Sequence, residues 1–216
     1  SFRIEAGEFV AIVGGSGAGK STLLDCLNGM RPATDGKIYY DGNDYYENVN
    51  SYSGVIGYVP QKDILHEDLT VHAALTYTAR LRTRAGLTGE EISACVNGAI
   101  AGVHLQGKEH LRISSLSGGQ KKRVSIAMEL LSDPKVIFLD EPTSGLDPVA
   151  RDEILDILYD FMQNSGHAVL ISSHITSDLE KLCDYVVFIH GGKVAVSGEK
   201  DALLEEYAVY GGNISD

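Results

Sequence analysis

Short, continuously apolar runs recur along this chain, separated by segments with helical spacing. The clearest runs are Phe9 to Val13, Val136 to Leu139 and Val186 to Ile189. Runs of this length are typical of parallel strands that are buried on both faces. None approaches the roughly 20 residues that a membrane-spanning helix requires. The pattern therefore predicts an α/β fold with a mainly parallel sheet, in a chain that meets a membrane only through a partner.

Turn residues and apolar spacing predict the remaining elements. We expect further strands at Lys37 to Tyr40, Val55 to Val59, Ala168 to Ser172, Tyr185 to His190 and Lys193 to Ser197, and helices at Lys20 to Asn28, from Pro148 onward with Asp147 as its cap, and at Asp201 to Val209. Gly191 and Gly192 join the last two strands as a hairpin, which adds an antiparallel portion to the sheet. Residues Ser1 to Glu5 read like the end of a strand entered from elsewhere, so we expect a fragment of a longer protein.

A helical block interrupts the strands between residues 69 and 132. Apolar residues recur there at helical spacing, namely Val71, Ala74, Leu75, Ala79 and Leu81. Further helices are expected near Glu90 to Val103 and after Ser117. We therefore divide the chain into a core, residues 1–68 and 133–216, and an inserted helical subdomain, about 69–132.

A glycine-rich loop lies between the first apolar run and the helix that follows it. It comprises Gly14, Gly15, Ser16, Gly17, Ala18, Gly19, Lys20 and Ser21. Glycines allow the backbone to curl around phosphate groups, where a side chain would collide with the oxygens. Lys20 supplies charge to the β and γ phosphates, the Ser21 hydroxyl suits Mg²⁺, and Thr22 adds a hydroxyl toward the α phosphate. Because a strand precedes it, a phosphate-binding loop of a P-loop NTPase explains this segment better than a mere glycine-rich turn.

Two acidic residues follow the apolar run Val136 to Leu139. Asp140 ends that strand, where its carboxylate can hold Mg²⁺ through water. Glu141 follows on the other side of the strand axis, nearer the γ phosphate. A strand that merely ends in solvated acids is the alternative. With the phosphate-binding loop present, a metal holder and a general base are the expected roles.

A third motif, Leu116-Ser117-Gly118-Gly119-Gln120, lies between the glycine-rich loop and the two acids. A serine and two glycines at a helix start present free N–H groups to an anion. With the motifs in this order, essentially the whole chain resembles the ATP-binding domain of an ABC transporter. The resemblance implies a P-loop NTPase core, ATP and Mg²⁺ as ligands, Asp140 as a metal-holding residue and Glu141 as the catalytic base.

The resemblance also implies roles for residues whose function their residue type and position alone do not indicate. Gln61 matches the glutamine that touches Mg²⁺ and water and links the core to the helical subdomain. His174 matches the switch histidine that contacts the γ phosphate. The signature motif comprises Ser117, Gly118, Gly119 and Gln120. In this family the motif faces the nucleotide of a second copy, so two domains pair head to tail.

The residues within and around the motifs are most similar to those of the White-type (ABC-G) exporters and their bacterial relatives. The segments that carry this likeness are Gly57 to Asp63, Ser117 to Leu130 and Asp140 to Asp147. In this family an aromatic residue that stacks on adenine would fall before Ser1. Phe2 is expected to face the core instead.

Composition narrows the range of partners. The formal net charge of −12 argues against nonspecific nucleic-acid binding, which requires a basic face. The three cysteines are far apart and form no CxxC motif, so neither a disulfide framework nor a zinc site is expected. The basic run Lys121 to Arg123 is expected to form a solvated helix face, with contact to phosphate or lipid headgroups as the alternative.

We therefore expect ATP hydrolysis by a head-to-tail dimer at the cytoplasmic face of a membrane. Hydrolysis would power transport, and more specifically export, through linked or separate transmembrane domains. One alternative is a soluble ABC ATPase acting on DNA or ribosomes, although neither a long coiled coil before the signature motif nor a second cassette is present. The other is a nonhydrolytic nucleotide sensor, against which Glu141 and His174 both count.

Overall fold

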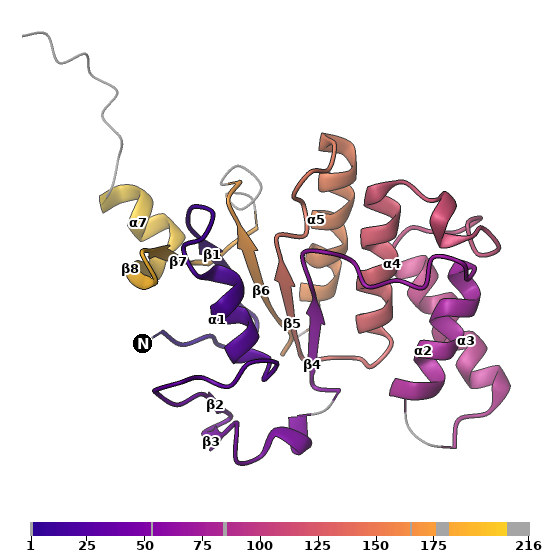
Figure 1. Cartoon of the computed structure of the whole chain (residues 1–216), viewed down its shortest axis with the longest axis horizontal. Coiled ribbons are helices and arrows are strands. Elements are labelled where there is room, and N and C mark those ends of the chain that lie inside the picture. Colours follow the sequence, from indigo (N-terminus) through magenta and orange to yellow (C-terminus); the bar gives the residue numbers. More distant parts are fainter. Residues whose placement is uncertain (1, 53, 84–85, 165, 176–181, 207–216) are drawn as a thin grey trace, which may run out of the picture.

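A six-stranded sheet with the order β4-β5-β6-β1-β7-β8 organises the molecule (Figure 1). The computed structural model describes residues 2–52, 54–83, 86–164, 166–175 and 182–206. The strands of this sheet are β1 (Phe9–Val13), β4 (Ile56–Val59), β5 (Val136–Asp140), β6 (Ala168–Ser173), β7 (Tyr185–His190) and β8 (Lys193–Glu199). All neighbours pair in parallel except β7 and β8, which form an antiparallel hairpin.

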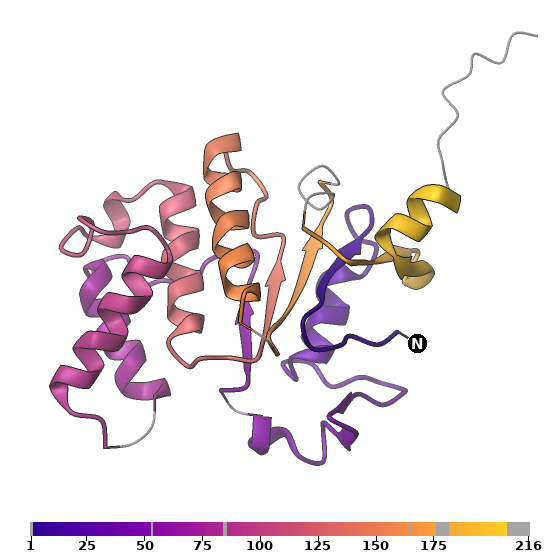
Figure 2. The same ribbon diagram turned by 180° about the vertical axis from the view of Figure 1, so that it is seen from behind.

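Helices cover both faces of this sheet, as the front and back views show (Figures 1 and 2). The helices of the described residues are α1 (Lys20–Leu27), α2 (Val71–Arg82), α3 (Gly89–Gly102), α4 (Gly118–Leu130), α5 (Pro148–Met162) and α7 (Lys200–Glu206), with short 3₁₀ turns at Val49–Tyr52 and Ile113–Ser115. Alternate residues of β1 face opposite layers because successive side chains of a strand point to opposite sides. Val10 and Ile12 pack with Leu24 of α1, whereas Ala11 belongs to the cluster that contains Ile154 of α5.

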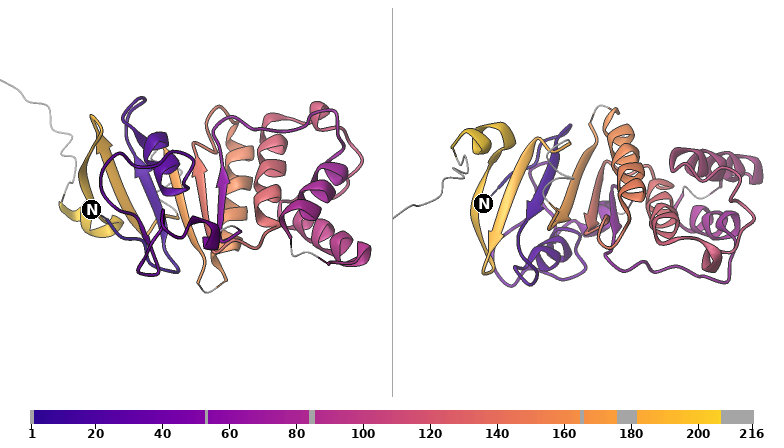
Figure 3. Two further views of the ribbon diagram at one scale, coloured as in Figure 1. Left: turned by 60° about the horizontal axis from the view of Figure 1, so that its bottom comes forward. Right: turned by 90° about the horizontal axis from the view of Figure 1, so that it is seen from above.

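The helices α2, α3 and α4 come between β4 and β5 in the sequence, although these two strands are neighbours in the sheet. In space the three helices extend beyond the β4 edge (Figure 3). Each begins at a hydroxyl residue, Thr70, Thr88 or Ser117, whose side chain accepts the N–H of the residue three positions later. Such caps stabilise a helix by about 1 kcal/mol. One apolar cluster runs from these helices to α5 and one face of the sheet, so the insertion is packed onto the core.

The predicted α/β class, the mainly parallel sheet, the hairpin and the helical insertion are confirmed. The expected strand Lys37 to Tyr40 is shorter, because only β2 (Tyr39–Tyr40) and β3 (Asn43–Asp44) pair there. Side chains hold this region in place of a longer ladder. Hydroxyls of Tyr40, Tyr45 and Tyr46 donate to carbonyls near the end of α1, at Leu27, Asn28 and Cys26. The closing helix begins at Lys200, and its expected end at Val209 lies outside the described residues.

The expected strand at the start of the chain is wrong for Phe2 to Glu5, and Ser1 lies outside the described residues. These residues form no strand in the structure. Arg3 pairs with Glu5, and the Gly7 N–H that follows this segment donates to the His167 carbonyl outside the strand pairing. Phe2 packs against the α1 side of the core, as expected.

The solvated face predicted for Lys121 to Arg123 is also wrong for two of its three residues. Lys122 and Arg123 are each only 5% exposed. Arg123 donates to the carbonyls of Val103 and His104 and pairs with Glu153 of α5. Helix α4 packs against α2, α3, α5 and β4, which leaves it little free surface for cations. Within the described ranges, no helix is both long and apolar enough to cross a membrane.

Candidate nucleotide-binding site

The glycine-rich loop follows β1 and leads directly into α1. Gly17 and Gly19 adopt left-handed backbone angles, with φ of 76° and 105°, which glycine adopts at little cost. Gly14 lies so close to β7 that a Cβ atom would sit 2.3 Å from the Ile189 carbonyl oxygen. No side chain caps α1, so its first N–H groups are available to an anion.

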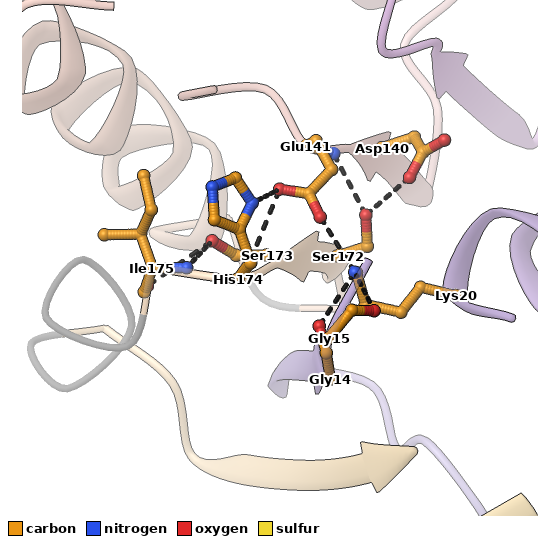
Figure 4. A network of polar contacts seen from close by, with 9 residues as sticks. All are labelled: Gly14, Gly15, Lys20, Asp140, Glu141, Ser172, Ser173, His174 and Ile175. Carbon is orange, nitrogen blue, oxygen red and sulfur yellow. Dashed lines mark hydrogen bonds and ion pairs between the residues drawn. The ribbon is translucent and has the colours of Figure 1, made fainter. Parts of the chain in front are cut away.

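Lys20, the first residue of α1, is buried and folds back over the loop (Figure 4). Its Nζ donates to the carbonyl oxygens of Gly14, at 2.9 Å, and Gly15, at 3.3 Å. The same ammonium lies 3.0 Å from Oε1 of Glu141. The Lys20 ammonium is thus held between the carbonyls of the loop and the Glu141 carboxylate.

Asp140 and Glu141 are held by one serine on the neighbouring strand. The register of β5 and β6 places Asp140 opposite Ser172. The Ser172 hydroxyl donates to Oδ1 of Asp140 at 2.6 Å and accepts the Glu141 N–H at 2.9 Å. Glu141 has φ 45°, a left-handed conformation that is uncommon in residues other than glycine and is found at functional sites. This turn directs the two adjacent carboxylates to different partners.

His174 contacts the second oxygen of Glu141. Its Nδ1 lies 2.5 Å from Glu141 Oε2, and its backbone N–H donates to the same oxygen. The histidine side chain is half exposed, whereas that of Glu141 is buried. The Glu141 carboxylate therefore bridges the loop lysine and the histidine at the rim of the site (Figure 4).

The pKa of Glu141 lies below its ordinary value. Burial raises the pKa of this carboxyl. The hydrogen bonds from Lys20 and His174, together with the charges of these side chains, lower the pKa by more than burial raises it. The side chain is consequently ionised at neutral pH. The ionised form is the one that a general base requires, and the contacts with Lys20 and His174 that lower its pKa also make it a weaker proton acceptor while they are in place.

The strand ends bring the sequence-predicted residues to one edge of the sheet. Val59 of β4 pairs with Leu139 of β5, so Gln61 and Glu141 each lie two residues after this pair. The glycine-rich loop follows β1, which lies next to β6. Ligands of parallel α/β sheets bind at this carboxyl edge. Gln61 has an exposed side chain and lies outside the network that joins Lys20, Glu141 and His174.

Asp140 and Ser21 provide a donor set suited to Mg²⁺. The Ser172 hydroxyl occupies Oδ1 of Asp140, and Oδ2 accepts no hydrogen bond from the described residues. Ser21 lies in the first turn of α1 with an exposed side chain. No group of three His, Cys, Asp or Glu residues is assembled within the described ranges. Mg²⁺ is typically bound by one or two protein oxygens together with water and substrate phosphates, so this sparse set fits.

The signature residues lie away from the glycine-rich loop of the same chain. Ser117 and Gln120 form a reciprocal capping box at the start of α4. Helix α4 packs on β4, whereas the loop follows β1, three positions away in the sheet order. Figure 1 shows β4, β5 and β6 between α1 and α4. Gly118 is exposed, and Gly119 is required by packing, because a Cβ atom there would lie 2.6 Å from that of Ala150.

Sequence reasoning missed Ser172 as a site residue. In the sequence it is only the last residue of the strand predicted before His174, whereas in the structure its hydroxyl contacts both Asp140 and the Glu141 N–H. The only signal was its position at the carboxyl end of a strand expected to lie in the same sheet. Which strand lies beside β5, and in what register, is not encoded locally.

Known proteins of one family are similar to this chain. The family model described as ABC transporter matches residues 1–144. The chain belongs to this family. An ABC transporter ATP-binding/permease protein of Mycobacterium tuberculosis is 37% identical over 92% of the chain, which spans 23% of that protein. The Nod factor export ATP-binding protein I of Rhizobium etli is 32% identical over 99% of the chain, which spans 68% of that protein.

Solved structures of ABC proteins share the fold as well. A cbiO1 subunit from Clostridium perfringens, part of an ABC transporter complex, superimposes with a TM-score of 0.84 at 31% identity, covering 95% of this chain and 82% of that one. A dimeric ATP-binding cassette in a post-hydrolysis state with ADP and Pi gives a TM-score of 0.82 at 27% identity, covering 92% and 88%. The White-type subfamily remains a prediction, since these comparisons support the family alone.

Proposed function

We propose that this chain binds ATP with Mg²⁺ and hydrolyses it as one half of a head-to-tail dimer. The observation that carries the proposal is the Glu141 carboxylate, which is buried, ionised and held between Lys20 and His174. Lys20 and the amides of Gly14, Gly15, Ser16, Gly17, Ala18 and Gly19 bind the phosphates, with Thr22 at the α phosphate. Glu141 accepts a proton from the attacking water, and His174 orients the carboxylate.

Mg²⁺ would be held by Asp140, directly or through water, by the Ser21 hydroxyl and by Gln61. The metal supplies charge that neutralises the phosphate oxygens as the terminal phosphoryl group leaves. Ser172 donates to one oxygen of Asp140, so the other would be available to the ion. These roles use residues that lie along one edge of the sheet.

The dimer follows from the separation of Ser117 from Lys20. The signature residues Ser117, Gly118, Gly119 and Gln120 form an exposed helix start that the chain's own phosphate loop does not reach. A second copy, turned head to tail, supplies the missing half of each site. The dimeric, ADP-bound cassette with a similar fold supports this arrangement.

Coupling to a membrane partner is supported by an open cleft between the segment after Gln61 and helix α2. The cleft has a volume of about 1020 Å³, and Leu65, Leu69, Tyr77 and Leu81 contribute apolar surface to it. Leu81 is 85% exposed, and nearby Ile64 is 80% exposed. Exposed apolar patches of this kind mark interaction sites. We infer a transmembrane domain as the occupant, a position at the cytoplasmic face, and export as the direction, as in the Nod factor relatives.

The function is tested by phosphate release and nucleotide binding in the full chain. The wild-type protein should hydrolyse ATP in the presence of Mg²⁺. Lys20→Ala should weaken ATP binding by at least ~1.5 kcal/mol, the lower range for a charge-assisted hydrogen bond. ATP binding without turnover in a dimer-competent wild-type protein would instead favour a nonhydrolytic sensor.

A further inference from the structure

Strand β4 is the outermost strand of the sheet on the side of the helical insertion. It pairs only with β5 among the described strands, so its outward backbone groups need other partners. Helix α4 provides them. Oε2 of Glu129 accepts the Tyr58 N–H at 3.1 Å, and Arg82 of α2 pairs with the same carboxylate oxygen.

Lys122 donates hydrogen bonds to the segment that follows β4. Its Nζ donates to the carbonyls of Pro60 and Gln61, each at 3.0 Å, and lies 2.7 Å from Oδ1 of Asp63. The Lys122 side chain is only 6% exposed. Of the three N–H donors of this ammonium, two are used by the Pro60 and Gln61 carbonyls, and Asp63 balances the charge as an ion-pair partner. Nothing in the proposed catalytic cycle uses this buried cation.

Lys122 and Glu129 form a clamp, in which the acid accepts a hydrogen bond from β4 and the lysine donates to the segment after it. Lys122 and Glu129 are seven residues apart, or about two helical turns, so they project from one face of α4. The carboxylate receives an N–H from the strand, and the ammonium donates to carbonyls beyond its end. Pro60 has no N–H, so its carbonyl is the one backbone hydrogen-bonding group of that residue, and Lys122 provides its donor.

We propose that Lys122 is a positioning residue that fixes segment 60–63, and with it Gln61, to the helix that begins at Ser117. Lys122 lies little more than one turn into α4, directly behind the signature motif. A displacement of the segment after β4 is therefore transmitted to the signature residues through one buried ammonium. This inference rests on the proposed function, because it concerns how the site's glutamine and the signature move together.

Lys121 provides a matched control on the same helix. Its Nζ pairs with Glu67 at 2.8 Å, but the Glu67 side chain is 54% exposed, and exposed pairs contribute little. Lys121→Met and Lys122→Met therefore remove the same charge, the first from a partly exposed pair and the second from the clamp. Lys122→Arg keeps a cation that can donate to the same oxygens and serves as the rescue variant.

The first measurement is hydrogen–deuterium exchange of the full chain without nucleotide. In Lys122→Met, exchange should rise by about tenfold both in residues 58–66 and in residues 117–126, because the contact that protects both segments is lost. In Lys121→Met it should stay within about twofold of wild type. Faster exchange in only one of the two segments would overturn the coupling, and so would unchanged exchange in both.

The second measurement is steady-state ATP hydrolysis by the same proteins. In Lys122→Met, kcat should fall by about tenfold or more while KM for ATP changes less than about twofold, since misplaced groups affect turnover more than phosphate binding. Lys122→Arg should recover at least half of the lost rate. If Lys122→Met does not fold, Asp63→Asn, which removes only the carboxylate partner, should show the same split at smaller amplitude. Normal turnover in the folded variants would overturn the proposal, whereas an inactive wild type would refute the proposed function and leave the exchange test standing.

Discussion

The Lys20 ammonium and the Glu141 carboxylate lie 3.0 Å apart and are both buried. In the proposed function, Lys20 binds phosphate and Glu141 activates water. Their contact holds both side chains in place, and in that proposal an incoming γ phosphate would compete with Glu141 for the lysine. Removing one partner of a buried pair leaves an uncompensated charge, which is strongly destabilising.

Glu141→Gln should abolish most turnover while leaving nucleotide binding intact. The amide keeps the shape of the carboxylate but cannot accept a proton, so hydrolysis should slow by about 10²- to 10⁴-fold. Because the neutral side chain no longer competes for Lys20, ATP affinity should not fall. Phosphate release and isothermal titration test the two parts separately. Full turnover in this variant would remove Glu141 from the role of base.

The pH dependence of stability should report the same carboxylate. Its pKa in the folded protein lies below the ordinary value of 4.5, so the unfolded chain binds the proton more tightly. The ionised group therefore stabilises the fold above pH 4.5, and this contribution is lost as the pH falls through the lower, folded-state pKa. In urea unfolding, wild type should lose stability more steeply below pH 4.5 than Glu141→Gln does. Parallel curves would contradict the assignment.

Ser172→Ala should impair metal use more than ATP binding. The hydroxyl directs Asp140 and also accepts the Glu141 N–H, which retains its second bond to the Ser172 carbonyl at 3.1 Å. Loss of a residue that orients a metal ligand lowers affinity or activity by about 10- to 100-fold. The Mg²⁺ concentration for half-maximal hydrolysis should rise, with ATP affinity nearly unchanged. Ser115→Ala, which removes only a local bond to the Arg112 carbonyl, is the control.

The parts of the site that lie within one continuous motif could be predicted from the sequence. The apolar run Phe9 to Val13 and the glycines after it define strand, loop and helix locally, and the structure gives β1 and α1 there. Ser172 and Lys122 could not be found in this way. Their roles depend on which strands become neighbours and which edge a helix covers. A cationic run such as Lys121 to Arg123 has the local pattern of a solvated face, and it is the oxygens of the segment after β4 that compensate the burial of Lys122.

Ser117→Arg should leave ATP binding by a single chain intact and abolish turnover. In the proposed dimer, the arginine side chain would occupy the space in which the partner's γ phosphate docks. The substitution also removes the N-cap of α4, which costs about 1 kcal/mol. Thr88→Arg is therefore the matched control, because Thr88 forms the same capping box at the start of α3. Its turnover should stay near the wild-type rate after correction for any unfolded fraction.

A mixing experiment makes the same prediction sharper. Chains with Ser117→Arg keep an intact phosphate loop, whereas chains with Lys20→Ala keep an intact signature motif. A heterodimer of the two contains one complete composite site, and each variant alone contains none. Mixing should therefore restore hydrolysis above the level of either variant, unless the two sites must act together. The decisive observation is the state of Ser117→Arg alone: normal hydrolysis by a monomer, measured by phosphate release alongside light scattering, would show that the site is complete within one chain and would end the head-to-tail dimer proposal.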